Sequence, residues 1–89
     1  AAFLATLSPA LAVQDAGTLV NEARQLMKAG KFAEAVPKFS EAIKQRPDYV
    51  AAYQDRGTCY FNLNKFPEAL KDFGEVIKLK PAVPQGYFN

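Results

Sequence analysis

The chain repeats itself with a period of 34 residues. When the sequence is aligned with itself at this offset, segment 31–35 (KFAEA) matches segment 65–69 (KFPEA). Further identities at the same offset are Phe39/Phe73, Glu41/Glu75, Ile43/Ile77, Lys44/Lys78 and Pro47/Pro81. Repeats of this length are small structural units that stack on one another, because a single unit cannot bury its own hydrophobic face. The first unit spans 16–49, the second spans 50–83, and a third begins at Pro84.

The first unit has the spacing of two helices joined by a short turn. Leu19, Ala23 and Leu26 recur at intervals of four and three residues, which places them on one face of a helix. Gly30 follows, and it can take the left-handed backbone conformation that ends a helix. The second helix should end before Pro47, because a residue preceding proline avoids the helical conformation. The expected inner face of this second helix consists of Ala35, Phe39, Ala42 and Ile43.

The second unit repeats this arrangement. Asn64 stands in the place of Gly30, and Pro67 falls in the first turn of the second helix, where its missing N–H costs nothing. Pro37 lies further inside the second helix of the first unit, so we expect a mild distortion there and not a break. The expected inner faces consist of Tyr53, Gly57 and Tyr60 in the first helix and Ala69, Phe73, Val76 and Ile77 in the second.

Small residues recur at equivalent places in the two units. Ala23 and Gly57 should let neighbouring helices approach closely, and Ala35 and Ala69 should do the same in the second helices. Cys59 lies next to the packing face, so we expect a small buried apolar residue and not a reactive thiol. The space between helices would be filled by Phe32, Phe39, Phe66 and Phe73.

This pattern resembles the tetratricopeptide repeat (TPR) family over residues 16–89. The places that define the repeat hold Leu19/Tyr53, Ala23/Gly57, Leu26/Tyr60, Ala35/Ala69, Phe39/Phe73, Ala42/Val76 and Pro47/Pro81. Segment 53–57 (YQDRG) looks like the Y-x-x-R-G variant of the family, and segment 87–89 looks like the start of its next copy. The resemblance implies an all-α fold, in which helix-turn-helix repeats stack as a right-handed superhelical α-solenoid.

The resemblance also implies where a partner would bind. In this family the first helices of the units line a concave face, which usually holds a peptide or a helix. Charged residues on a helix surface, such as Arg24 and Lys28, are more often solvated than bound to a partner. Met27 and Phe61 could instead cover the next helix, and solvent could satisfy the polar candidates. The groove candidates carried onto this chain are Val20, Arg24, Met27, Lys28, Gln54, Thr58, Phe61, Asn62, Gln85 and Phe88.

One known class of TPR partner is disfavoured by the sequence. TPR domains that hold the acidic C-terminal tails of the Hsp70 and Hsp90 chaperones use a clamp of lysine, arginine and asparagine at set places in the groove. In this chain those places hold Val20, Arg24, Asp55, Gln85 and Asn89. The lysines of the clamp are missing, and Asp55 would repel a carboxylate. We therefore expect a partner other than such a tail.

The composition argues against several other functions. The chain has no histidine and a single cysteine. Without histidine it lacks the commonest general base, the usual metal ligand and the common catalytic triads, so we expect no enzyme activity, no cofactor and no metal. Its 11 basic and 9 acidic residues alternate along the chain, whereas a nucleic-acid partner requires clustered basic residues.

The N-terminal segment differs from the repeats. Residues 1–13 (AAFLATLSPALAV) carry no charge and are too few to span a bilayer. Residues 1–12 are typical of the end of a secretory signal peptide, with a small-x-small cleavage site at 10–12 and a linker at 13–15. This predicts a periplasmic, secreted or organelle-lumen protein, for example in the thylakoid. The alternative is a retained apolar helix that packs on the repeats or on a partner, so any membrane contact would involve residues 1–13 alone.

Two functions remain open from the sequence. The first is a non-enzymatic module that binds a peptide or helix of a partner in the concave groove. The second is a structural or assembly subunit of a larger complex, with membrane association of that complex left open. Because the first residue is not methionine, we expect the chain to be cut from a longer precursor, with a third unit truncated at 84–89. Further repeats or self-association would then cover the open end, since solenoids generally need about three repeats.

Overall fold

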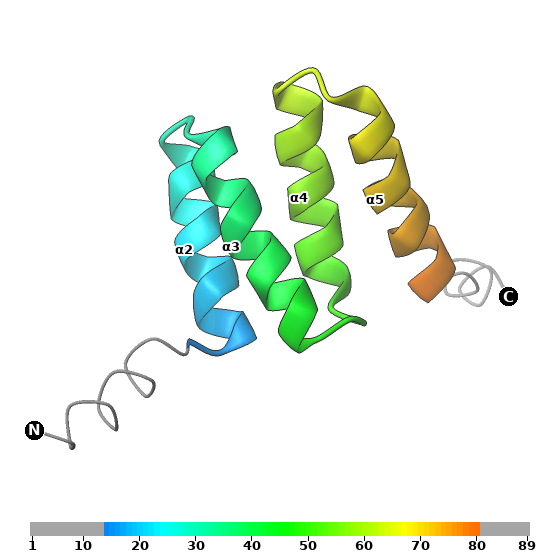
Figure 1. The fold of residues 1–89 in the computed structure, drawn as a ribbon, viewed down its shortest axis with the longest axis horizontal. Helices are drawn as coiled ribbons and strands as arrows, with labels where there is room; N and C mark the ends of the chain where they lie inside the picture. Colours follow the sequence, from blue (N-terminus) through cyan, green and yellow to red (C-terminus); the bar gives the residue numbers. More distant parts are fainter. Residues whose placement is uncertain (1–13, 81–89) are drawn as a thin grey trace, which may run out of the picture.

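Four helices make up the part of the chain that the structure describes. The structure is a computed structural model, and it describes residues 14–80. The helices are α2 (Ala16–Lys28), α3 (Phe32–Gln45), α4 (Val50–Asn62) and α5 (Phe66–Leu79), and no strand occurs between residues 14 and 80. Figure 1 shows them side by side, with consecutive helices running in opposite directions. The all-α fold of stacked helix pairs is therefore confirmed.

Both helix pairs turn in the same way. Gly30 and Asn64 have positive φ angles of 79° and 63°, the left-handed conformation expected after a helix. In the first turn, the N–H of Lys31 donates to the carbonyl oxygen of Leu26 at 2.8 Å. In the second, the N–H of Lys65 donates to the carbonyl oxygen of Tyr60 at the same distance. Each turn thus adds a hydrogen bond to a carbonyl near the helix end, beside those from the N–H groups of Ala29 and Leu63.

Three further residues explain where the helices begin and continue. Asp15 caps α2, because its carboxylate accepts a hydrogen bond from the N–H of Thr18 at 2.7 Å. This hydrogen bond lowers the pKa of the Asp15 carboxyl. Pro67 lies in the first turn of α5, as expected, and α3 runs through Pro37 without interruption. The sequence had indicated only a linker where Asp15 lies.

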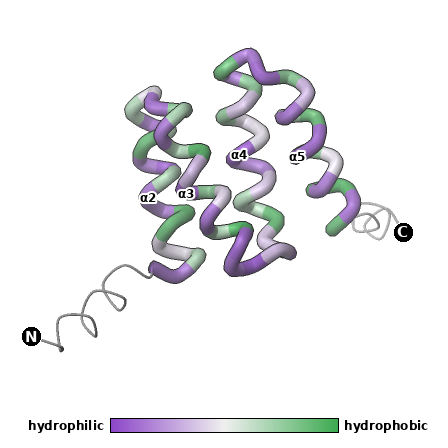
Figure 2. Tube along the Cα trace, in the orientation of Figure 1, coloured by the Kyte–Doolittle hydropathy of each residue, from purple (hydrophilic) through white to green (hydrophobic). Residues whose placement is uncertain are grey.

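The core lies where α2, α3 and α4 meet. Phe39 is fully buried at the centre of this core. Burying such a side chain stabilises a fold by about 1.5–3 kcal/mol relative to leaving it exposed. Cys59 is fully buried as well, which confirms its reading as a small packing residue. The buried cluster also contains Ala16, Leu19, Val20, Ala23, Ala35, Ala42 and Ala52. Figure 2 shows hydrophilic and hydrophobic residues alternating along the helices, as expected for helices with one buried side.

The second pair packs through one very close contact. A Cβ atom added to Gly57 would lie 2.7 Å from Cε1 of the Phe73 ring. This confirms that a small residue at this place lets α4 and α5 approach closely. Ile77, however, is 69% exposed, although the sequence pattern placed it on the inner face. That expectation is wrong because no helix within residues 14–80 covers this side of α5.

Other parts of the sequence interpretation fall outside the described residues. They include the signal peptide expected at 1–12 and the third unit expected from Pro84, with the groove candidates Gln85 and Phe88. Among the four described helices, none combines the length and the hydrophobicity needed to cross a membrane.

Candidate partner-binding groove

The first helices of the two pairs, α2 and α4, contact each other directly. Of the groove candidates on α2, Arg24 and Lys28 are exposed, and Met27 is half-buried against the core. Val20 is only 1% exposed and belongs to the same buried cluster as Leu19 and Ala52. The expectation that Val20 faces a partner is therefore wrong, because its side chain is used to pack the helices together.

An ion pair joins the two helices of the groove. The Nε of Arg24 on α2 donates to Oδ2 of Asp55 on α4 at 2.7 Å. The Arg24 side chain remains 47% exposed and that of Asp55 22% exposed. Pairs in such exposed surroundings stabilise a fold by about 0–1 kcal/mol, because water screens them and two long side chains must be ordered. The pair therefore matters more for the charge of the groove than for stability.

Polar side chains continue along α4, and two of them bond to their own helix. The hydroxyl of Thr58 donates to the carbonyl oxygen of Gln54 at 3.0 Å, and Nδ2 of Asn62 donates to the carbonyl oxygen of Thr58 at 2.8 Å. Gln54 and Asn62 are exposed, whereas Thr58 is half-buried. These contacts hold the Thr58 and Asn62 side chains against their own helix.

An apolar hollow lies at the end of α4, where the chain turns into α5. Phe61 is 57% exposed, and its ring meets that of Phe66 edge to face with the centroids 5.3 Å apart. Such pairs stabilise by about 0.5–1.5 kcal/mol beyond simple burial. The hollow has a volume of about 280 Å³ and is lined by Phe61, Phe66, Ala69, Leu70 and Phe73. It forms an exposed apolar surface between the end of α4 and α5.

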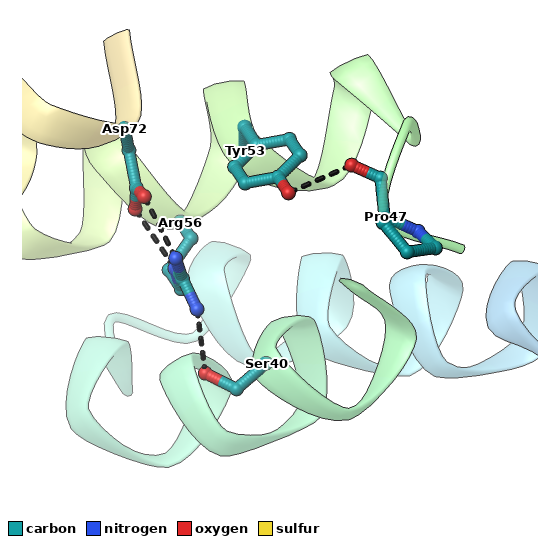
Figure 3. A network of polar contacts seen from close by, with 5 residues as sticks. All are labelled: Ser40, Pro47, Tyr53, Arg56 and Asp72. Atoms are coloured by element: carbon teal, nitrogen blue, oxygen red, sulfur yellow. Dashed lines mark hydrogen bonds and ion pairs between the residues drawn. The ribbon is translucent and has the colours of Figure 1, made fainter. Parts of the chain in front are cut away.

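A second, buried ion pair was missed by the sequence interpretation. Arg56 on α4 donates from Nε and Nη2 to the two carboxylate oxygens of Asp72 on α5, at 2.8 and 2.7 Å (Figure 3). Its Nη1 also donates to Oγ of Ser40 on α3, at 3.0 Å. The hydrogen bonds to Asp72 raise the pKa of the Arg56 guanidinium, against the opposing effect of burial. One side chain therefore ties three helices together.

Aromatic rings surround this buried pair. The guanidinium carbon of Arg56 lies 5.9 Å from the ring centroid of Tyr53 and 5.7 Å from that of Tyr60. The hydroxyl of Tyr53 in turn donates to the carbonyl oxygen of Pro47 at 2.7 Å (Figure 3). Tyr53 thereby fixes the start of α4 to the turn before it. The tyrosines predicted for the inner face thus also stabilise the buried charge.

Metal-ligating groups and the single cysteine were the other candidates for chemistry among the described residues. No group of three or more metal-ligating side chains occurs within residues 14–80. Burial, with a smaller contribution from the nearby Asp55 charge, raises the pKa of the Cys59 thiol to about 11. At neutral pH this group is a protonated thiol, which is a poor nucleophile.

Comparisons with known proteins agree with this geometry. A family model described as tetratricopeptide repeat matches residues 20–86. The chain belongs to the tetratricopeptide repeat family. This TPR chain is also 42% identical over 74 residues to Hsp70-Hsp90 organizing protein 3 from Arabidopsis thaliana. The match covers 79% of the TPR chain but only 13% of that relative. Family membership and this relative support a protein–protein interaction module with protein partners.

Proposed function

We propose that this TPR chain binds a peptide or a helix of a partner protein in the groove formed by α2 and α4, and that it has no catalytic activity of its own. One observation carries the proposal. The groove sides of these helices expose polar and aromatic side chains that the core does not use, whereas their other sides pack on α3 and α5. The exposed groove residues are Arg24, Lys28, Gln54, Phe61 and Asn62.

The charged groups of the groove limit which partner segments it can bind. The name of the Arabidopsis relative refers to Hsp70 and Hsp90. In this chain, however, Asp55 occupies the groove beside Arg24, at 2.7 Å. A carboxylate on the partner would meet a cation that is already paired. The partner proposed for this groove is therefore a segment other than an acidic chaperone tail.

A selection from a random peptide library displayed on phage tests the groove. Binders are selected against the 89-residue chain, and their affinities are then measured for groove variants and for matched controls. Gln54→Ala and Asn62→Ala are expected to weaken selected peptides about tenfold, since each removes an exposed hydrogen-bonding group. Lys44→Ala, on the exposed side of α3, should have no effect. Selected peptides that respond to Lys44→Ala and ignore both groove variants would refute the proposal.

A second candidate function is an assembly subunit held through α5. Leu70 and Ile77 on this helix are 73% and 69% exposed, and Phe66 is half exposed. Exposed apolar rows of this kind mark interaction surfaces in soluble proteins. Light scattering after size-exclusion chromatography would test this candidate. Association that Leu70→Lys and Ile77→Lys abolish would favour the assembly function, and a stable monomer at high concentration would count against it.

The location of the protein is a separate proposal. It rests on the uncharged residues 1–13 and the small-x-small pattern at 10–12. Under this proposal, residues 1–12 are removed from a protein that acts in a periplasm, outside the cell or in an organelle lumen. Sequencing the N-terminus of the mature protein tests it. A mature start at Val13 would support cleavage, and a mature start at Ala1 would rule it out.

A further inference from the structure

The Arg24–Asp55 pair in the groove uses only one nitrogen of the arginine and one oxygen of the aspartate. The contact runs from Nε of Arg24 to Oδ2 of Asp55, at 2.7 Å. Within residues 14–80, neither the Nη atoms of Arg24 nor Oδ1 of Asp55 makes a hydrogen bond. The pair therefore presents a group of donors and an acceptor side by side, one from each of the two helices that form the groove.

This arrangement treats charged and neutral partners differently. A partner carboxylate that reaches the Nη atoms of Arg24 also comes close to the Asp55 carboxylate, so attraction and repulsion largely cancel. A partner ammonium group near Asp55 meets Arg24 with the same result. A neutral segment has no such conflict. The primary amide of Asn or Gln can accept from Arg24 through its C=O and donate to Asp55 through its N–H, and in an extended backbone the C=O and N–H of one residue lie on the same side and can do the same.

We infer that the Arg24–Asp55 pair makes this groove select a partner segment that is uncharged at this point and presents an amide, from the peptide backbone or from an Asn or Gln side chain. Asp55 is the residue that determines this specificity, because its charge cancels that of Arg24. The inference rests on the proposed groove function and adds the chemical class of the bound segment.

The surroundings of the pair agree with a neutral partner. Gln54 and Asn62 offer exposed uncharged amides on α4, and Phe61 offers an exposed ring further along the same helix. Lys28 is the other charged groove candidate, and it lies exposed in the last turn of α2. A segment that follows α4 therefore meets amides and an aromatic ring on the same helix as Asp55.

The test uses two labelled hexapeptides with the same spacing of side chains. The acidic probe alternates glycine with glutamate and ends in a free carboxylate, and the neutral probe alternates glycine with glutamine and ends in an amide. Fluorescence anisotropy at low ionic strength, where charge effects are least screened, gives their affinities for the 89-residue chain. The variants are Asp55→Asn and the double variant Arg24→Gln/Asp55→Asn. Circular dichroism melting curves check that both remain folded, as expected for an exposed pair.

We expect Asp55→Asn to gain affinity for the acidic probe, and we expect this gain to depend on Arg24. Asp55→Asn should bind the acidic probe about tenfold more tightly than the wild type, because it removes a repulsive charge close to Arg24. The double variant should lose this gain. Binding of the neutral probe to Asp55→Asn should change by less than about twofold, because the Asn amide oxygen can still accept from a peptide N–H. No gain in Asp55→Asn, or a gain that persists in the double variant, would overturn the inference. The library selection described above would be unaffected by that failure, so the two proposals are tested separately.

Discussion

The two helix pairs follow the same sequence pattern but are buried to different extents. Phe39 on α3 is fully buried, whereas its counterpart Phe73 on α5, 34 residues later, is only partly buried. Ile43 is half-buried and its counterpart Ile77 is exposed. The difference arises because α4 packs on α3, whereas no helix within residues 14–80 packs on the corresponding side of α5. In a repeat protein, burial therefore depends on the neighbouring unit as well as on the unit's own sequence.

In each helix pair an ion pair joins the two helices, and the charges are exchanged between the two units. Glu22 and Lys38 form the pair in the first unit, at 2.9 Å, and Arg56 and Asp72 occupy the same two places in the second. The first pair is exposed, with side-chain exposures of 40% and 37%, and the second is largely buried, with 20% and 3%. Hydrogen bonds from Lys38 and then from Gln14 lower the pKa of the Glu22 carboxyl. The same link between helices is thus made on the surface in one unit and in the interior in the other.

The largest expected difference between the units concerns the two phenylalanines. Phe39→Ala should lower the free energy of unfolding by about 3–5 kcal/mol, because it opens a cavity at a fully buried site. Phe73→Ala should cost clearly less, since water already reaches part of that ring. Urea unfolding followed by circular dichroism measures both. If Phe39→Ala fails to fold, the pair Phe39→Leu and Phe73→Leu should show the same order, and equal losses would contradict the comparison.

The exchanged ion pairs give the next largest difference. Asp72→Asn leaves the Arg56 charge poorly compensated, so it should lower the free energy of unfolding by about 2–3 kcal/mol. This loss is smaller than for a fully buried pair, because the Arg56 side chain is 20% exposed. The matched change in the first unit, Lys38→Gln, should cost at most about 1 kcal/mol, since that pair is solvated. Thermal melting at low and high salt would separate them. A similar cost and a similar salt response for both variants would show that burial does not distinguish the pairs.

A smaller effect is expected where α4 and α5 approach most closely. Gly57→Ala places a methyl group 2.7 Å from the Phe73 ring, so the ring must move. Overpacking of this kind costs about 1–3 kcal/mol, and the better helix propensity of alanine offsets up to about 1 kcal/mol. The net result should be a modest loss of stability in urea unfolding. Adding Phe73→Leu should relieve the clash, so the double variant should lose less stability than the two single variants lose together. A loss larger than that sum would argue against this explanation.

The repeat itself could be predicted from the sequence, because its helix spacing and its turn residues are local properties. Gly30 and Asn64 took the expected left-handed conformation, and α3 continued through Pro37. Side-chain environments were harder to predict. Val20 was assigned to the groove from its place in the repeat, yet it is buried in the core, since a face position does not reveal how closely neighbouring helices pack.

The buried ion pair was missed for a related reason. Its two partners lie 16 residues apart on different helices, and at both places the residues differ between the units in the sign of their charge. A search for identical residues at an offset of 34 therefore does not detect these two places. A search for opposite charges at the two places within each unit would have found both pairs, since Glu22 and Lys38 are matched by Arg56 and Asp72. The pairing is retained in both units even though neither residue is.

The smallest predicted effect is a gain in stability at Gly74. This glycine lies inside α5, and a Cβ atom added there would meet nothing within 4 Å, in contrast to Gly57. Gly74→Ala should therefore raise the free energy of unfolding by about 0.5–1 kcal/mol, because alanine loses less conformational entropy in a helix. Urea unfolding of Gly74→Ala beside Gly57→Ala gives the comparison directly. Since Ser40, the counterpart of Gly74, accepts a hydrogen bond from Arg56 on the next helix, this place in α3 is an interface. A loss of stability in Gly74→Ala would contradict this expectation and would indicate that the exposed side of α5 contacts another molecule in solution.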